Sequence, residues 1–254
     1  QAFQEISLSL NELHSHQDWS DFYIKMLYWE MELEGLEDLA MLEIFQNQMK
    51  EANRLFAKFI ENNYQEWIVN ESGPLMSHQI LKEKLFPFLK KESGKTTLML
   101  VIDNLRFDQW KMIAPIIENH YQKEEESSYF SILPTATHFA RNAIFSGMMP
   151  LEMQINHPEL WVNENEEGGK NLNEAAFLKA QLQRNGIDSQ FSYSKITNLK
   201  AGREFIQSLN NRKKDDLLVV VYNFVDMISH AKTEMEIIKE LASDNKAFRS
   251  LTLS

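Results

Sequence analysis

Hydrophobic and polar positions follow two different patterns that meet near residue 72. Before that point apolar residues recur at steps of three and four, which is the pattern of amphipathic helices. It predicts helices over residues 3–13, from Ser15 to a stop at Gly35, and over residues 37–69. Ser15 and Asp18 resemble a capping box. We therefore expect residues 1–72 to form a small helical bundle, because such helices bury their apolar faces against one another.

From residue 96 onward the apolar residues occur in short continuous runs. Such runs predict strands buried on both faces, and helical patterns lie between them. The expected strands cover residues 96–102, 129–133, 190–193 and 217–223. This alternation is typical of a parallel sheet with helices on both sides. The predicted fold class is therefore α/β, with the sheet domain over residues 73–254.

The segments between the strands predict helix ends and one loop. Gly147 and Gly186 each end a helical pattern, and a terminal helix is expected from Thr233. Residues 151–172 are rich in Asn, Glu and Gly, so we expect a long loop there.

Composition narrows the range of functions. The 254 residues contain no Cys, so any metal must be held by Asp, Glu, His or hydroxyl oxygens. A net charge of -11 argues against a general duplex-binding surface, and the basic run at residues 212–214 is most simply a solvated loop. No apolar run approaches the roughly 20 residues of a membrane helix. Nothing resembles a signal peptide, so we expect no membrane insertion and a cytoplasmic location.

Polar side chains stand where a parallel sheet binds ligands. Asp103 ends the first strand, Thr137 begins the helix after the second, and Asp226 and His230 follow the last strand. Ligands collect at the carboxyl ends of parallel strands. Oxygen and imidazole ligands suit a cation such as Zn²⁺ or Mn²⁺, and a helix N-terminus favours phosphate.

Each of these residues also has an ordinary structural explanation. Asp103 and Thr137 could each cap a helix. Asp226 and His230 lie four residues apart and could form a surface pair on one helix face. Their occurrence together favours a metal-assisted phosphoryl-transfer site.

The strings that carry these residues, VIDNLRFD, LPTATHFARNAIFSG and YNFVDMISH, resemble the PglZ domain of the alkaline phosphatase superfamily. The chain is similar above all to PglZ-domain response regulators of the type IX secretion system, in which a receiver domain precedes a helical bundle and the PglZ domain. The stretch LYWEMELEGLEDLAMLEIF is similar to that bundle. The resemblance covers essentially the whole chain and implies the output part of a two-component regulator.

The resemblance implies a role for each residue of the site. Asp103 and Thr137 would bind one metal of a zinc pair, and Thr137 would also attack phosphorus. Asp226 and His230 would bind the second Zn²⁺. The implied activity is that of a zinc-dependent phosphodiesterase acting on nucleotides or oligonucleotides.

Two further residues lie beside the implied nucleophile as candidates for substrate binding. They are His138 and Arg141. Arg141 could grip phosphate oxygens, and a surface salt bridge is the other interpretation.

The chain departs from the family pattern in two ways. The Asp-His pair and the more distant His that complete the superfamily site do not occur before Ser254. We therefore expect a C-terminally truncated fragment that binds zinc weakly or not at all and is inactive. We likewise expect this fragment to lack the receiver domain through which an upstream sensor kinase would act.

Two hypotheses about function follow. The first is a zinc-dependent phosphodiesterase within the regulator. The alternative is a non-catalytic module that forms a homodimer through the helical bundle and binds secretion-system regulatory proteins or a nucleotide. An inert adaptor is disfavoured, because Asp103, Thr137, Asp226 and His230 are all present.

Overall fold

The computed structural model describes residues 2–33, 39–70, 72–91, 95–162, 171–212, 214–234, 240 and 245–253. The chain forms two compact units: unit 1 comprises residues 1–74, 105–128 and 230–254, and unit 2 comprises residues 75–104 and 129–229. Two segments of the expected sheet domain thus pack in unit 1, and the domain boundary at residue 72 stays a prediction. Among the described helices, none has the length and apolar character needed to cross a membrane.

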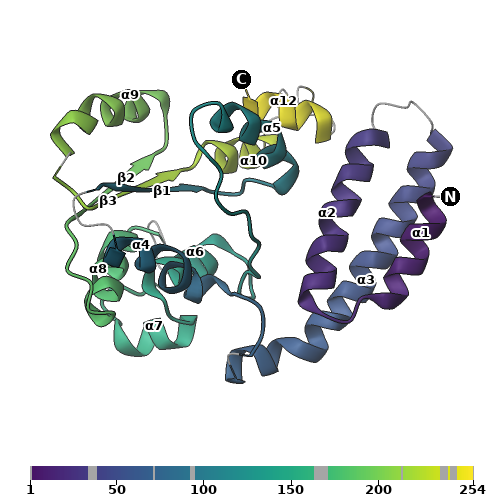
Figure 1. Ribbon diagram of the computed structural model, residues 1–254, viewed down its shortest axis with the longest axis horizontal. Coiled ribbons are helices and arrows are strands. Elements are labelled where there is room, and N and C mark those ends of the chain that lie inside the picture. The colour runs from purple at the N-terminus through teal and green to yellow at the C-terminus, as the bar shows by residue number, and fades with distance from the viewer. Residues whose placement is uncertain are drawn as a thin grey trace. The chain divides into compact units, whose positions relative to one another are not determined.

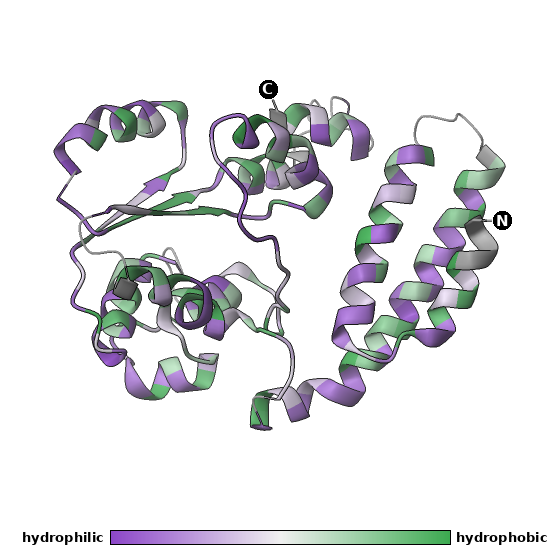
Figure 2. Ribbon diagram, viewed as in Figure 1, coloured by the Kyte–Doolittle hydropathy of each residue, from purple (hydrophilic) through white to green (hydrophobic). Residues whose placement is uncertain are grey.

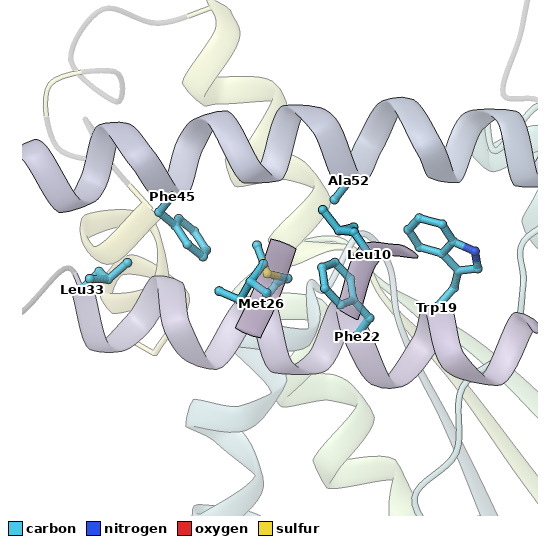
Figure 3. Packing of buried hydrophobic residues seen from close by; sticks show 8 residues of the cluster. Leu10, Trp19, Phe22, Met26, Leu33, Phe45 and Ala52 are labelled. Atoms are coloured by element: carbon cyan, nitrogen blue, oxygen red, sulfur yellow. The ribbon is translucent and has the colours of Figure 1, made fainter. Parts of the chain in front are cut away.

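Unit 1 contains the predicted helical bundle. Its helices are α1 (Ala2–Ser9), which continues into the 3₁₀ turn η1 (Leu10–Glu12), α2 (His16–Leu33) and α3 (Leu39–Asn70) (Figure 1). Hydrophilic and hydrophobic segments alternate along α2 and α3, as Figure 2 shows. The apolar sides meet in one core cluster, shown in Figure 3 and made of Ile6, Leu10, Trp19, Phe22, Met26, Leu33, Phe45 and Ala52. The helix end predicted at Gly35 lies outside the described residues.

The predicted capping box at the start of α2 is confirmed. The backbone N–H groups of His14 and Ser15 donate to Oδ2 of Asp18 at 3.1 and 2.7 Å. The N–H of Asp18 donates in return to Oγ of Ser15 at 3.1 Å. These bonds satisfy backbone donors that have no partner within the helix.

Two helices from later in the chain also belong to unit 1. They are α5 (Phe107–Glu118) and α12 (Asn245–Leu253), and they contact each other. Asp108 on α5 accepts hydrogen bonds at Oδ2 from Arg106 (2.5 Å) and Arg249 (2.8 Å). Burial by itself would raise the pKa of Asp108, but these two guanidinium groups hold it below its ordinary value. The buried ion pair between Asp108 and Arg249 therefore links α5 to α12.

Unit 2 is built on the predicted parallel sheet. The strands β1 (Thr97–Ile102), β2 (Phe191–Ile196) and β3 (Leu217–Tyr222) are ordered β1-β3-β2, and both pairings are parallel. The central strand β3 is buried over residues 217–221, as its continuous apolar run predicts.

Helices lie on both faces of this sheet, as expected. The helix α9 (Leu199–Ser208), followed by the short turn η4 (Leu209–Arg212), lies on one face (Figure 1). The opposite face carries α4 (Phe86–Lys91), α6 (Thr137–Ser146) and α8 (Glu174–Arg184). The short helical turns η2 (Ser77–Gln79) and η3 (Leu81–Leu85) precede α4.

Gly147 ends α6 as predicted, for two physical reasons. Its φ of 63° is left-handed, which side chains disfavour. A Cβ at this position would also lie 2.2 Å from Nε2 of Gln181.

The strand expected over residues 129–133 is wrong. This segment makes only an isolated parallel bridge between Phe130 and Met76. Ile132 is fully buried, and its N–H donates to Oγ of Ser77 at 3.1 Å. Ile132 is therefore used for packing, whereas Tyr129 and Leu133 are exposed, and the backbone of this segment does not join the sheet.

Two other local predictions also need correction. Residues 150–156 of the expected loop form the helix α7 (Pro150–Asn156), which Pro150 begins and Met153 anchors in the core. The terminal helix expected from Thr233 is not a single element: α10 (Phe224–Glu234) includes its first two residues and α12 (Asn245–Leu253) its last nine described ones, and residues 235–239 and 241–244 lie outside the described residues. The seven residues of α7 are too few for a periodic pattern to be recognised beside polar neighbours.

Candidate functional site

The three strands of unit 2 end level with one another. Ile102 of β1 and Ile196 of β2 both pair with Tyr222 of β3. The next residue after β1 is Asp103, whose backbone N–H donates to the carbonyl oxygen of Tyr222 at 3.1 Å. Asp103 therefore lies beside the point where β3 leads into α10.

A buried arginine holds the carboxylate of Asp103. Nη1 of Arg141, on α6, donates to Oδ2 of Asp103 at 2.5 Å. Nε of Arg141 donates to Oε1 of Glu174, the first residue of α8. The side chains of Arg141 and Asp103 are 4% and 13% exposed. The salt bridge expected for Arg141 is present, but it is buried and not on the surface.

The surroundings of Asp103 contain charges of both signs. Burial raises the pKa of Asp103 above its ordinary value, and the positive charge of Arg141 opposes that shift. The carboxylates of Asp226 and Glu174 add to it, and Lys195 opposes it more weakly. The three carboxylates of Asp103, Asp226 and Glu174 repel one another, and an added cation would lower that repulsion.

Thr137 is the first residue of α6 and is partly exposed. Ala136 occupies the N-cap position, so the alternative interpretation of Thr137 as the capping residue is wrong. Arg141 lies four residues later on the same side of the helix. The ion pair between Arg141 and Asp103 therefore ties the Thr137 side of α6 to the end of β1.

His138 follows Thr137 on α6 and is partly buried. Its ring centroid lies 3.9 Å from that of Phe139. Its predicted contact with substrate stays a prediction.

Asp226 and His230 lie four residues apart on α10, so they share one side of that helix. Asp226 is partly buried in unit 2 and acts on the pKa of Asp103. His230 is exposed and belongs to unit 1. The structure therefore brings Asp103, Arg141 and Asp226 together in one unit, and the metal role of His230 stays a prediction.

Sequence reasoning missed Glu174 and Tyr193. Glu174 is 1% exposed, and the hydroxyl of Tyr193 donates to its Oε2. Burial raises the pKa of Tyr193 strongly, and the charge of Glu174 raises it further. An acidic residue in the first turn of a helix has an ordinary role with the helix dipole, so its position alone gave no signal.

The donor groups at this edge suit a hard or borderline cation. They are the carboxylates of Asp103 and Asp226 and the hydroxyl of Thr137. Oδ1 of Asn223, directly after β3, is buried and accepts no hydrogen bond within the described part of the chain. Across the described residues, no group of three or more His, Asp or Glu side chains is preassembled to hold a metal ion. The site fits a cation in its chemistry and its charge.

Comparisons with known proteins identify two families along the chain. Residues 80–253 match the family described as the BREX system PglZ alkaline phosphatase-like domain. Residues 1–68 match the family described as the PorX response regulator linker domain. No curated protein matches the chain. Both matches agree with the resemblance found in the sequence.

Proposed function

Because the chain belongs to the PglZ alkaline phosphatase-like family, we propose that its α/β part contains a metal-dependent phosphodiesterase site with Thr137 as nucleophile. The linker match supports a PorX-like response regulator effector, and such a linker implies an upstream sensor in general. The proposed substrates are nucleotides or oligonucleotides. The proposed output is control of type IX secretion.

One observation supports this proposal most directly. Asp103 directly follows β1, Asp226 lies in the first turn of α10 after the adjacent parallel strand β3, and the charge of Asp226 raises the pKa of Asp103. The helix that carries Thr137 is tied to the same strand end through Arg141. The first groups of the proposed cation site, including a hydroxyl group, therefore all come from this edge of the sheet.

The PglZ alkaline phosphatase-like fold is generally metal-dependent. We assign Asp103 and Thr137 to one Zn²⁺, and Asp226 and His230 to a second. A bound pair would lower the pKa of the Thr137 hydroxyl and polarise the phosphoryl oxygens. The assignment of His230 rests on the family resemblance alone.

The residues of the chain then divide the chemistry as follows. The oxygen of the Thr137 hydroxyl forms a bond to phosphorus while the P–O bond to one alcohol breaks, and the proton lost by Thr137 ends on the departing alcohol. Backbone N–H groups in the first turn of α6 stabilise the charged phosphoryl oxygens. Water then breaks the threonyl–phosphate bond and restores Thr137.

A non-catalytic regulatory module is the second candidate function. The linker match over residues 1–68 favours it, because a response regulator transmits its signal through such a segment. In this proposal the bundle forms a homodimer, and the α/β part binds a nucleotide or secretion-system regulatory proteins.

Hydrolysis of bis(p-nitrophenyl) phosphate by the full-length protein tests the first proposal. We expect Thr137→Ala to lose about 10³-fold or more in kcat, because no hydroxyl remains to attack phosphorus. Thr137→Ser keeps a hydroxyl and should retain measurable activity. Thr135→Ala is the matched control, since Thr135 is exposed and precedes α6.

The alternative outcomes separate the two candidates. Equal activity of the wild type and Thr137→Ala would show that Thr137 is not the nucleophile. Stoichiometric zinc without hydrolysis of any diester tested would favour the regulatory module. Acid quenching followed by mass spectrometry of the peptide that contains residue 137 checks directly for threonyl phosphate.

A further inference from the structure

Glu174 and Tyr193 form a buried support behind the ion pair of Asp103 and Arg141. Glu174 accepts a hydrogen bond from Arg141 on one carboxylate oxygen and from Tyr193 on the other. A carboxylate that is 1% exposed would be costly to bury without such partners. The position and the charge of Glu174 are therefore both set by the fold.

The guanidinium of Arg141 is shared between two acids. Its Nε donates to Glu174, and its Nη1 donates to Asp103. If Asp103 were the sole acid beside it, the charge of Arg141 would offset the charge of Asp103. Because Glu174 already balances Arg141 in the buried interior, Asp103 keeps negative charge at the strand end.

We propose that Glu174 is a positioning residue. It holds Arg141 against Asp103 and neutralises the charge of Arg141, so that Asp103 stays available to a dication. This inference rests on the proposed function, in which Asp103 binds Zn²⁺. Glu174 itself touches neither metal nor substrate in this proposal.

The test is the zinc dissociation constant of the full-length protein, measured by competition with a chromophoric chelator. Glu174→Gln keeps the shape and removes the charge, and we expect zinc binding about 10–100-fold weaker, the usual loss for a residue that supports a metal ligand. Tyr193→Phe keeps the charge of Glu174 and should have a smaller effect. Thermal unfolding of each variant is measured in parallel.

A double variant separates charge balance from simple packing. Arg141→Gln combined with Glu174→Gln removes one positive and one negative charge, so it should bind zinc more tightly than Glu174→Gln alone. It also removes both charges of the fully buried Arg141–Glu174 pair, so it remains informative if Glu174→Gln does not fold. In that case its zinc affinity is compared with the wild type and should be similar.

The possible results distinguish this inference from the function on which it rests. Glu174→Gln with a lowered Tm but wild-type zinc affinity would overturn the role of Glu174. A double variant with zinc affinity as weak as Glu174→Gln, or far below wild type, would also overturn it. If Asp103→Asn binds zinc as tightly as wild type, or if the wild type binds none, the proposed metal site is wrong.

Discussion

Asp103 and Asp108 belong to one short string of sequence and both pair with arginine, yet the balance of charge around them differs. In unit 2, one guanidinium is shared by two carboxylates, those of Asp103 and Glu174. In unit 1, the single carboxylate of Asp108 accepts hydrogen bonds from two guanidinium groups. The pKa of Asp103 is raised, and that of Asp108 is lowered.

The difference separates a structural carboxylate from one that can bind a ligand. Asp108 has a surplus of positive partners and lies in the first turn of α5, where the helix dipole also favours its charge. Its negative charge is therefore already compensated and does not favour binding of a further cation. Asp103 shares its guanidinium partner with Glu174 and lies near Asp226, and an added cation would relieve the repulsion among these carboxylates. Similar residue types thus form a structural ion pair in unit 1 and a candidate ligand-binding group in unit 2.

The largest effect on stability is expected at Asp108. Asp108→Asn leaves two guanidinium groups without their carboxylate, and removing one partner of a buried pair costs about 3–5 kcal/mol. Asp108 and Arg249 are 1% and 4% exposed, so water replaces little of the loss. Urea unfolding followed by tryptophan fluorescence measures this change in unit 1, because every tryptophan except Trp161 lies there.

Asp21→Asn is the matched control for this prediction. Asp21 is exposed on α2 and accepts a hydrogen bond from Gln17 at 2.9 Å. Its substitution should leave the urea midpoint within error of the wild type. Equal midpoints for Asp108→Asn and Asp21→Asn would contradict the structural role of Asp108.

Acid should produce the next largest effect, with opposite signs at the two carboxylates. Because the folded pKa of Asp108 is lowered, its stabilisation is complete above the unfolded value of about 3.9 and is lost as pH falls through the folded pKa. The folded pKa of Asp103 is raised, so its contribution is complete below the unfolded value and is lost as pH rises through the folded pKa.

Urea midpoints measured between pH 7 and pH 3 check this sign. The difference in urea midpoint between wild type and Asp108→Asn should become smaller toward pH 3. Protection of the β3 amides from hydrogen exchange reports on unit 2. As pH falls, this protection should increase in the wild type relative to Asp103→Asn. If the urea midpoints of wild type and Asp108→Asn depend on pH in the same way, the proposed difference between Asp108 and Asp103 is wrong.

The smallest effect is expected for Asp103→Asn at neutral pH. Arg141 keeps its bond to Glu174, and loss of the Asp103 charge also removes the penalty for burying it. The net change should be about 1 kcal/mol or less, close to that of one hydrogen bond. Hydrogen exchange of residues 217–222 measures it. A loss as large as that of Asp108→Asn would mean that Asp103 is mainly a structural residue.

Strong local patterns predicted most of the fold. The periodicity of residues 37–69 corresponds to α3, and the apolar run at residues 217–223 corresponds to β3. The prediction failed at residues 129–133, which make only an isolated bridge and place Ile132 alone of their apolar side chains fully in the core. Local sequence describes what a segment can do, and pairing in the sheet depends on which segments become neighbours.

The candidate site was predictable to a similar extent. Asp103, Thr137 and Asp226 were found because they follow strands or begin helices, and these positions are visible along the chain. The contacts of Arg141 with Glu174, and of Glu174 with Tyr193, join distant positions that no local pattern connects.

The sequence alone determined the helical bundle, the parallel sheet and the chemical types of the groups at the strand ends, because periodicity and the order of elements are local properties. Only the tertiary structure decided which charges became neighbours, and therefore that the pKa of Asp103 is raised and that of Asp108 lowered. Electrostatic effects depend on distance and burial, and a linear sequence contains neither.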